Sequence, residues 1–186
     1  MDQKTWDSSA VKGLIWFTDG SRTAEGNRAG VYGQSAGKRL SISLVKQATV
    51  CQAEVYGLLA CVHETETQDR PEKYVSVCSD SQVALKELEA ANTTSQLVRQ
   101  YQKALNDIAS RHTVGLYWVS GHAVIGRNEI ADRLARDVSV HRFVGPEPFL
   151  GVSRQNKRRM MKRWVENQHL VLWRGPGSTH RDRLEN

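Results

Sequence analysis

Short apolar runs bounded by turn-forming residues predict five β-strands in this chain. The first three follow one another without a helix between them, and Ala36-Gly37-Lys38 supplies a hairpin turn between the second and the third. Three such strands predict an antiparallel meander. The five runs occupy residues 14–18, 29–35, 39–45, 74–79 and 114–120.

Between the third and fourth strands the apolar period changes to that of a helix. Val55, Leu58 and Val62 recur at helical spacing, and this helix should end between residues 65 and 71. Three further helices are predicted: residues 81–89, residues 127–138, and between them a helix that is capped by Thr94 or Ser95 and reaches Ile108.

The resulting order of elements is βββαβααβα, which predicts an α/β fold with a mixed five-stranded sheet flanked by helices. Because a helix separates the third strand from the fourth, the fourth strand should return parallel to the first by a right-handed crossover. No internal repeat is visible in the chain.

A stiff break at Gly145-Pro146-Glu147-Pro148 places a domain boundary near residue 142. We expect an N-terminal extension over residues 1–13, a folded domain over 14–142 and a C-terminal extension over 143–186. The extension should contain an amphipathic helix at about 153–173. Its apolar face holds Met160, Met161, Trp164, Val165, Val171 and Leu172, and its basic side chains are Arg154, Lys157, Arg158, Lys162 and Arg163.

The formal charge of +6 lies entirely near the C-terminus. Residues 1–138 hold 16 Lys and Arg against 16 Asp and Glu, whereas residues 139–186 hold 10 against 4. A basic appendage beside a neutral domain indicates a polyanionic partner, so we take the five basic side chains of the extension as candidate nucleic-acid contacts. A solvated charged helix, or a helix whose apolar face docks on the domain, is the alternative interpretation.

The cysteine pattern indicates a protein that stays inside the cell, in the cytoplasm, the nucleus or both. Cys51, Cys61 and Cys78 are odd in number and lack zinc-ligand spacing, which predicts reduced and mostly buried thiols. No run of about 18 apolar residues occurs, and the N-terminus lacks the regions of a signal peptide. We therefore expect a soluble protein without a membrane partner.

Four acidic residues at the ends of predicted elements carry the candidate chemistry: Asp19, Glu54, Asp80 and Asp132. Asp19 and Asp80 each follow a predicted strand, where ligands of open sheets bind. Glu54 and Asp132 lie on helical stripes that face a core. Carboxylates gathered without Lys or Arg beside them raise one another's pKa unless a divalent cation neutralises them. Oxygen ligands without a His or Cys cluster favour magnesium or manganese.

Taken singly, each acid also has a structural interpretation. Asp19-Gly20 is a common turn dipeptide, Asp80 could cap a helix, Glu54 could complement a helix dipole and Asp132 could face water. The case for a shared metal site therefore depends on the four residues together.

The motifs around these acids resemble those of the ribonuclease H family, in order and approximate spacing. They are Thr18-Asp19-Gly20-Ser21, Gln52-Ala53-Glu54, Ser79-Asp80-Ser81-Gln82, Trp118-Val119-Ser120-Gly121-His122 and Asn128-Glu129-Ile130-Ala131-Asp132. The resemblance covers about residues 14–173. It is closest to the ribonuclease H domains of non-LTR retrotransposon polyproteins, because of Ala29-Gly30-Val31-Tyr32, Gln52-Ala53-Glu54-Val55-Tyr56 and the stretch at 145–148.

This resemblance implies a ribonuclease H-like fold and hydrolysis of the RNA strand of RNA/DNA hybrids with two Mg²⁺ ions, for which Mn²⁺ may substitute. It implies that Asp19 bridges both ions, that Asp132 helps to hold the ion that activates water, and that Glu54 and Asp80 hold the other. His122 would shuttle a proton or assist product release. A neighbouring reverse transcriptase domain would be a further partner, with the chain acting in reverse transcription.

The resemblance further implies contacts between substrate and Gly20, Ser21, Gln52, Ser81, Gln82 and Asn128. Of these, Ser81, Gln82 and Asn128 resemble positions that either touch the nucleic-acid backbone or support the acids. The chain departs from the family at Ser120, Val124 and Arg127, which should alter the flexibility of the loop around His122. It also lacks the additional basic helix that bacterial members insert after Asp80, so affinity for the hybrid must come from elsewhere. The alternative function is a non-catalytic module that binds nucleic acid or a protein partner, which the intact set of acids disfavours.

Overall fold

The computed structural model describes residues 4–5, 11–24, 26–68, 71–90, 93–120, 126–137, 150–152 and 154–173. The chain divides into two compact units, Met1–Gly151 and Val152–Asn186. The first unit contains the sheet and four helices, and the second contains a single helix among its described residues.

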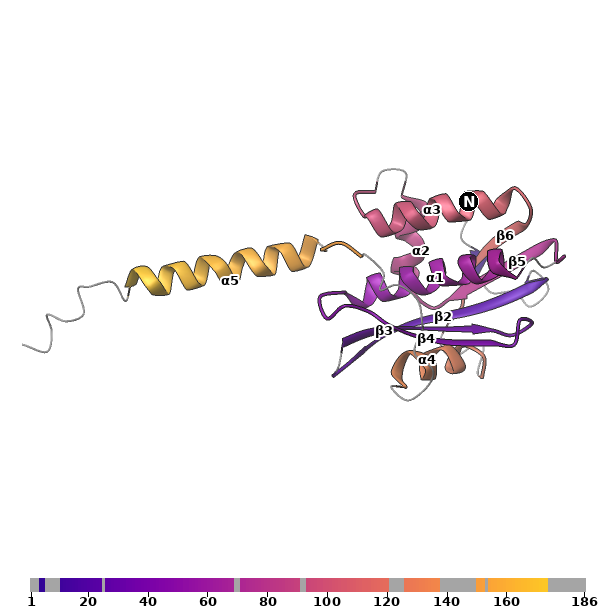
Figure 1. The fold of residues 1–186 in the computed structure, drawn as a ribbon, viewed down its shortest axis with the longest axis horizontal. Helices are drawn as coiled ribbons and strands as arrows, with labels where there is room; N and C mark the ends of the chain where they lie inside the picture. The colour runs from indigo at the N-terminus through magenta and orange to yellow at the C-terminus, as the bar shows by residue number, and fades with distance from the viewer. Residues whose placement is uncertain are drawn as a thin grey trace, which may run out of the picture. The chain divides into compact units, whose positions relative to one another are not determined.

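The sheet is mixed, with the strand order β1-β6-β5-β2-β3-β4 (Figure 1). The β2–β3 and β3–β4 pairs are antiparallel, and β5 lies parallel to both β2 and β6. This arrangement confirms the predicted meander and the parallel return of the fourth predicted strand, β5, beside β2. The strands are β1 (Lys4–Thr5), β2 (Leu14–Thr23), β3 (Gly26–Gly33), β4 (Lys38–Ser43), β5 (Tyr74–Ser79) and β6 (Thr113–Trp118).

Two features of the sheet differ from the sequence prediction. The two-residue strand β1 pairs parallel to β6 and adds a sixth strand at the edge, and it is too short to produce an apolar pattern. β2 was predicted to end at Thr18 before a flexible stretch, but it continues to Thr23. The reason is its partner, because β3 supplies a continuous antiparallel ladder that pairs Asp19 with Gly30. Asp19 therefore lies inside a strand and has a fixed direction.

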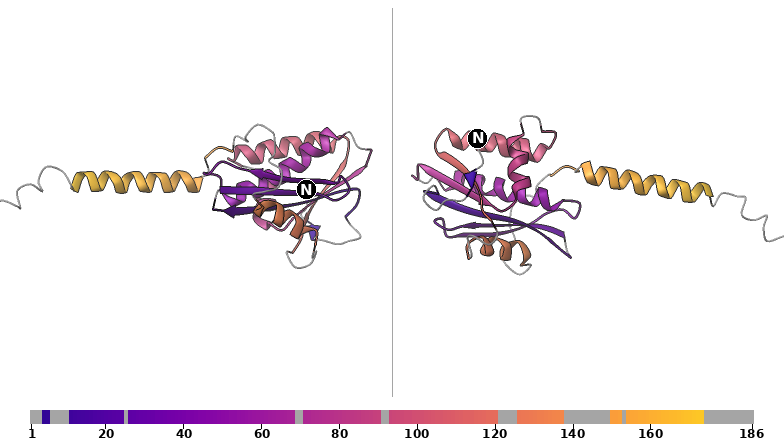
Figure 2. Two further views of the ribbon diagram at one scale, coloured as in Figure 1. Left: turned by 60° about the horizontal axis from the view of Figure 1, so that its bottom comes forward. Right: turned by 180° about the vertical axis from the view of Figure 1, so that it is seen from behind.

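Helices cover both faces of the sheet (Figures 1 and 2). One face carries α1 (Val50–Thr67), α2 (Gln82–Glu89) and α3 (Gln96–Ala109), and the opposite face carries α4 (Asn128–Arg136). Successive side chains of β2 point to opposite faces of the sheet and so enter two separate hydrophobic cores. Trp16 packs into the core under α1 and α3, whereas Phe17 packs into the core under α4. The predicted α/β fold is thus confirmed.

A capping box fixes where α1 begins. The Thr49 hydroxyl oxygen accepts from the Gln52 backbone N–H at 3.1 Å, and the Gln52 side-chain oxygen accepts from the Thr49 backbone N–H at 3.0 Å. Since both donors of the first turn are satisfied, the helical phase of the residues that follow is set. Glu54, two positions further on, consequently faces the sheet and is buried.

The second unit is represented by α5 (Arg154–Trp173). Its side chains from Lys157 to Leu170 are exposed, including those of Met160 and Trp164. Within the described ranges, none of the helices is both long enough and apolar enough to span a bilayer. The three cysteines are free thiols, and Cys61 and Cys78 are buried as predicted.

Candidate metal centre

Asp19, Glu54 and Asp80 converge at one end of the sheet, although they come from three different elements. Each offers a carboxylate oxygen, and these oxygens all lie within 4.8 Å of one another. The register explains the meeting, because β2 and β5 are parallel neighbours and Thr18 pairs with Ser79, so the next residue on each is an aspartate. α1 then brings Glu54 over β2. Three of the four acids predicted to act together are thus adjacent.

Gly20 makes room for Glu54. A Cβ atom at position 20 would lie 2.8 Å from the Glu54 backbone nitrogen and 2.9 Å from its Cγ and Cδ atoms. Any side chain there would force α1 away from β2 and move the Glu54 carboxylate. We predicted Gly20 as a substrate contact, and the structure gives this glycine a packing reason of its own.

Asp132 occupies a different environment from the other three acids. Its Oδ1 atom forms an ion pair with Nε of Arg136 at 2.7 Å, one helical turn further along α4, and its side chain is 32% exposed. The expectation that no Lys or Arg lies beside the acids is therefore wrong at this position. The spacing of four residues on α4 produces the pair. Asp132 is still close enough to raise the pKa of Asp19 through its negative charge.

The position of Asp132 depends on direct contact between α4 and β3. A Cβ atom on Gly30 would overlap the Ala131 carbonyl oxygen and approach the Ala135 nitrogen to 2.6 Å. At the other end of the helix, the Asp137 carbonyl oxygen accepts from Arg28 Nη1 at 3.0 Å and from the Ser41 hydroxyl at 3.4 Å. Helix and sheet are thus joined at backbone level, which places Asp132 near the strand that carries Asp19.

Burial and mutual repulsion make the three clustered carboxylates difficult to ionise. Burial, followed by the charges of Asp80 and Asp132, raises the pKa of Asp19 to about 7. Burial and then the charge of Asp19 raise the pKa of Glu54 to about 9, although a hydrogen bond from the Gly20 backbone opposes this. Burial also raises the pKa of Asp80. The positive charge of Arg136 opposes the shift of Asp19 but does not cancel it, so the pKa of Asp19 stays raised.

A divalent cation fits this donor set. The Glu54 Oε2 atom is fully buried and accepts no hydrogen bond from any residue in the described part of the chain. A buried carboxyl oxygen without a hydrogen-bond partner is costly in a protein interior, whereas coordination to a cation would satisfy it and would offset the repulsion between the ionised carboxylates. The ligands are all carboxylate oxygens, which suits Mg²⁺ or Mn²⁺. Asp19, Glu54 and Asp80 would hold such an ion, with Asp132 close by.

These pKa shifts predict how stability responds to pH and magnesium. Glu54 and Asp19 ionise near pH 4 when unfolded but only near pH 9 and 7 when folded, so the folded state keeps protons that the unfolded state loses. The metal-free protein should therefore lose stability as pH rises from about 5 to 9. Mg²⁺ should restore it, with a larger gain in Tm at pH 8.5 than at pH 6, by about 5 °C or more.

Thermal melts at several pH values, with Mg²⁺ or with a chelator, measure this effect. Glu54→Gln is the matched variant, because it keeps the shape of the side chain and removes the group with the larger shift. Its melts should depend less on pH and gain less from Mg²⁺. Equal magnesium responses of the variant and the unmodified chain at pH 8.5 would contradict the assignment of Glu54 as a ligand.

Asp80 is held in place by two donors from other elements. Asn128, a buried residue at the start of α4, donates from Nδ2 to Asp80 Oδ2 at 3.1 Å, and the Trp118 indole N–H donates to the Asp80 carbonyl oxygen at 3.0 Å. The sequence motifs suggested Asn128 as a substrate contact or as support for the acids, and its hydrogen bond to Asp80 favours the second role. Trp118 was not among the candidates, and its place opposite Ser79 on the neighbouring strand is the signal that could have identified it.

The other predicted substrate contacts are divided between solvent and structural roles. Gln82 is exposed at the start of α2, and Ser21 is half-buried on β2. The Ser81 hydroxyl caps α2 by accepting from the Ala84 N–H at 3.3 Å. The Gln52 amide accepts from the Thr49 N–H in the capping box, and its Nε2 atom donates to the carbonyl oxygens of Leu150 at 3.1 Å and Gly151 at 3.3 Å. A substrate contact by Gln52 would have to replace one of these bonds and stays a prediction.

Several predicted residues lie outside the described part of the chain. His122 and the altered loop position Val124 fall within residues 121–125, and the Gly145 to Pro148 stretch falls within 138–149. The Arg154 side chain is also outside the described set, although its backbone begins α5. The basic side chains of Lys157, Arg158, Lys162 and Arg163 are described and exposed.

Comparison with known proteins gives one finding. A family model described as RNase H matches residues 11–140, a range that contains the four acids, Asn128 and His122. No curated protein matches the chain. Residues 145–148, which suggested the retrotransposon branch, lie beyond the matched range, so the branch stays a prediction.

Proposed function

Since the chain belongs to the RNase H family, we propose that it is an endonuclease that hydrolyses the RNA strand of RNA/DNA hybrids with two divalent metal ions. The observation that supports this most directly is the cluster of Asp19, Glu54 and Asp80, whose carboxylate oxygens lie within 4.8 Å of one another. A buried set of acids is unfavourable for a module that only binds a polyanion, because it would repel the phosphates. It becomes useful when dications are bound between protein and phosphate.

The four acids have different proposed roles in metal binding, according to their environments. Asp19 is central, because its pKa responds to the charges of both Asp80 and Asp132. Divalent ions held by these carboxylates would lower the pKa of a water molecule and would neutralise charge on the scissile phosphate. Asn128 keeps the Asp80 carboxylate in one orientation through its hydrogen bond. Asp132 is more exposed and paired with Arg136, so it can exchange partners on the solvent side.

His122 is proposed as the group that moves the proton. An imidazole titrates near neutral pH, so it can accept a proton from water or donate one to the leaving oxygen. Its place in the sequence, between β6 and α4, connects it to the strand that carries Trp118 and to the helix that carries Asp132.

Substrate recognition should depend on groove shape and on the 2′-hydroxyl groups of the RNA strand, which distinguish RNA from DNA. Ser21, half-buried on β2, and Gln82, exposed on α2, are the proposed contacts. Because contacts to sugar and phosphate carry little base information, we expect weak sequence preference.

The function is tested with four substrates of the same sequence, each labelled at the 5′ end of one strand: single-stranded RNA, an RNA duplex, an RNA/DNA hybrid with the label on the RNA, and a DNA duplex. With Mg²⁺ we expect internal cleavage of the RNA strand when it is paired with DNA, and little or none otherwise. A chelator should stop the reaction. A folded chain that binds the hybrid but leaves the RNA strand intact would instead support the non-catalytic module.

The finer proposal is that the chain is the ribonuclease H domain of a non-LTR retrotransposon, or derives from one, and removes RNA during reverse transcription beside a reverse transcriptase domain. The motif Ala29-Gly30-Val31-Tyr32 supports it, together with Gly145-Pro146-Glu147-Pro148. The genomic sequence upstream of the codon for Trp6 tests it. A reverse transcriptase reading frame is expected there, and an unrelated reading frame would contradict the proposal.

A further inference from the structure

The first half of α5 is more basic than a helix without a partner can readily support. Six of its first ten residues are Lys or Arg and none is acidic. Like charges recur four residues apart, as in Arg158 and Lys162, a spacing that destabilises an isolated helix. Among the described side chains of α5, Lys162 Nζ pairs with Glu166 Oε1 at 3.9 Å, a long contact between exposed groups. These charges are therefore mostly uncompensated within the helix.

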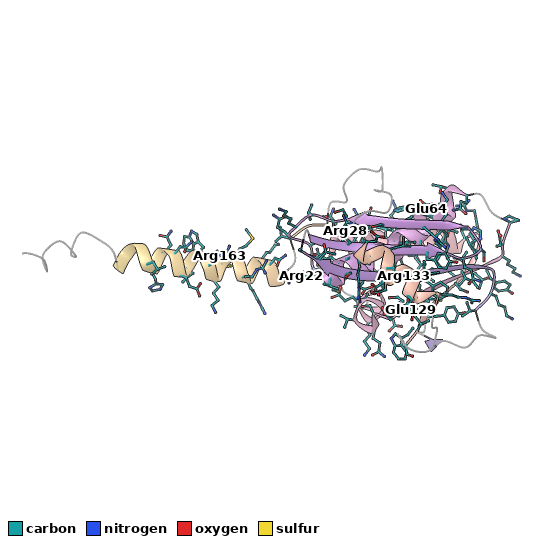
Figure 3. All side chains as sticks on the ribbon, turned by 90° about the horizontal axis from the view of Figure 1, so that it is seen from below. Arg22, Arg28, Glu64, Glu129, Arg133 and Arg163 are labelled. Carbon is teal, nitrogen blue, oxygen red and sulfur yellow. The ribbon has the colours of Figure 1, made fainter. Side chains whose placement is uncertain are left out.

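Four of these cations form one surface, which we call the basic face: Arg158, Arg159, Lys162 and Arg163. At helical spacing they fall on one side of α5, and Met160 and Trp164 fall on the other. The side chains of the basic face are all exposed, and Arg163 is seen projecting from the helix in Figure 3. A continuous exposed row of guanidinium and ammonium groups is complementary to a regular polyanion.

The unit that carries the acids cannot supply this attraction through its net charge. Residues 1–151 contain 17 Lys and Arg and 17 Asp and Glu, so their formal charge is zero, whereas residues 152–186 contain 9 and 3 and carry the whole +6. A neutral unit with an anionic centre gains little from long-range attraction to a nucleic acid. The second unit holds the charge that the first lacks.

The chain leading into α5 is fixed beside the helix that carries Glu54. Gln52 Nε2 donates to the carbonyl oxygens of Leu150 at 3.1 Å and Gly151 at 3.3 Å, and Leu150 is buried in the core. α5 begins three residues after Gly151. A short covalent tether from this point raises the effective concentration of the basic face near any substrate bound at the acids.

We propose that α5 is a nucleic-acid-binding arm, whose basic face contacts the phosphates of the RNA/DNA hybrid while the first unit engages the scissile bond. This rests on the proposed function. The arm contributes salt-dependent affinity without base recognition, because each phosphate contact releases bound counterions. It takes the place of a basic helix within the catalytic unit, where α2 and α3 together hold only Lys86, Arg99 and Lys103.

The test compares two fourfold variants of the full chain. The arm variant carries Arg158→Gln, Arg159→Gln, Lys162→Gln and Arg163→Gln, and glutamine is chosen because its helix propensity is close to that of Lys and Arg. The matched control removes the same charge from exposed positions of the first unit, with Lys73→Gln, Arg99→Gln, Lys103→Gln and Arg111→Gln. Both also carry Asp80→Asn, so that the hybrid survives the measurement.

Fluorescence anisotropy with a labelled hybrid in Mg²⁺ then gives Kd between about 50 and 200 mM salt. We expect the arm variant to bind about tenfold more weakly at low salt, with a slope of log Kd against log salt that is smaller by about two to four. The control should stay within about twofold of the parent. Equal affinities and slopes for arm variant and control would overturn the proposal.

Two further measurements separate the remaining explanations. The first is cleavage of the RNA strand by the chain with Asp80 intact. No cleavage, with a salt slope that still depends on the basic face, would contradict the nuclease assignment alone. Normal cleavage, with a salt slope that does not depend on the basic face, would contradict the role of α5 alone. The second measurement is binding to vesicles that contain phosphatidylserine, because basic amphipathic helices also bind anionic lipid. Vesicle binding that depends on the basic face, with an unchanged hybrid slope, would assign α5 to a membrane surface and overturn the proposal.

Discussion

Replacing Asp80 with asparagine should reduce cleavage of the RNA strand by about a thousandfold or more and at the same time stabilise the metal-free protein. The amide keeps the size of the carboxylate and an oxygen that can accept from Asn128. It removes a negative charge that helps to hold the cations. It also removes a charge that raises the pKa values of Asp19 and Glu54, so the remaining acids repel one another less.

The combination of the two effects distinguishes a metal ligand from a structural residue. Asp107→Asn on α3 is the control, since it makes the same chemical change at an exposed position. Initial rates in Mg²⁺ and melts at pH 8 in a chelator should be measured for both variants. If Asp80→Asn lowered stability as well as activity, its role would be to maintain the fold, and the metal assignment of Asp80 would be wrong.

Gly30→Ala is expected to have the second-largest effect, although Gly30 has no side chain that could bind a metal ion and only pairs with Asp19 through the β2–β3 ladder. The new methyl group would overlap the Ala131 carbonyl oxygen and crowd the Ala135 nitrogen, both of which are backbone atoms of α4. Backbone cannot rotate away as a side chain can, so the helix must move. We expect a loss of about 3 kcal/mol in the free energy of unfolding and, because Asp132 moves with α4, a large loss of cleavage in the molecules that stay folded.

Gly57→Ala is the matched control for this substitution. Gly57 lies in α1 on the other face of the sheet, and its nearest neighbour to an added Cβ is the Thr18 Cβ at 3.3 Å. Alanine is also the better helix former, so the net change should be within about 1 kcal/mol. Urea denaturation followed through tryptophan fluorescence measures both variants. Equal unfolding free energies for Gly30→Ala and the unmodified chain would contradict the close contact of α4 with β3.

The order of elements could be predicted from the sequence because each element has an internal period. The buried runs of β2 and β5 and the helical spacing of α1 are local patterns, and they place Asp19, Asp80 and Glu54 at the same end of the sheet. The rule that parallel strands end at one edge places only Asp19 and Asp80 together. The prediction that Glu54 and Asp132 join them rested on the resemblance of the motifs to those of the ribonuclease H family.

Features that depend on pairing between distant residues could not be predicted in this way. The extension of β2 through Asp19 is decided by the ladder with β3, and β1 is defined only by its pairing with β6. Gly20 and Gly30 lie in the motifs quoted above, but the packing role of each is decided by the helix that lies against it. Long-range packing, rather than local propensity, sets these positions.

The ion pair of Asp132 and Arg136 could not be predicted for a different reason. Their spacing of four residues is visible in the sequence, but an acid followed by a base four positions later is common on exposed helices. Whether Asp132 points toward Asp19 or along its own helix depends on how α4 sits on β3. The structure gives both, because Asp132 raises the pKa of Asp19 and contacts Arg136 at 2.7 Å.

The central claim is that Asp19, Glu54 and Asp80 form a binding site for divalent cations. Anomalous diffraction from crystals grown with Mn²⁺ tests it most directly, because manganese can be located independently of the protein density. We predict an anomalous peak within about 2.5 Å of oxygens from all three carboxylates, a typical distance for a hard cation and its ligands. Fully occupied manganese elsewhere in the crystal, with no peak among these carboxylates, would contradict the account.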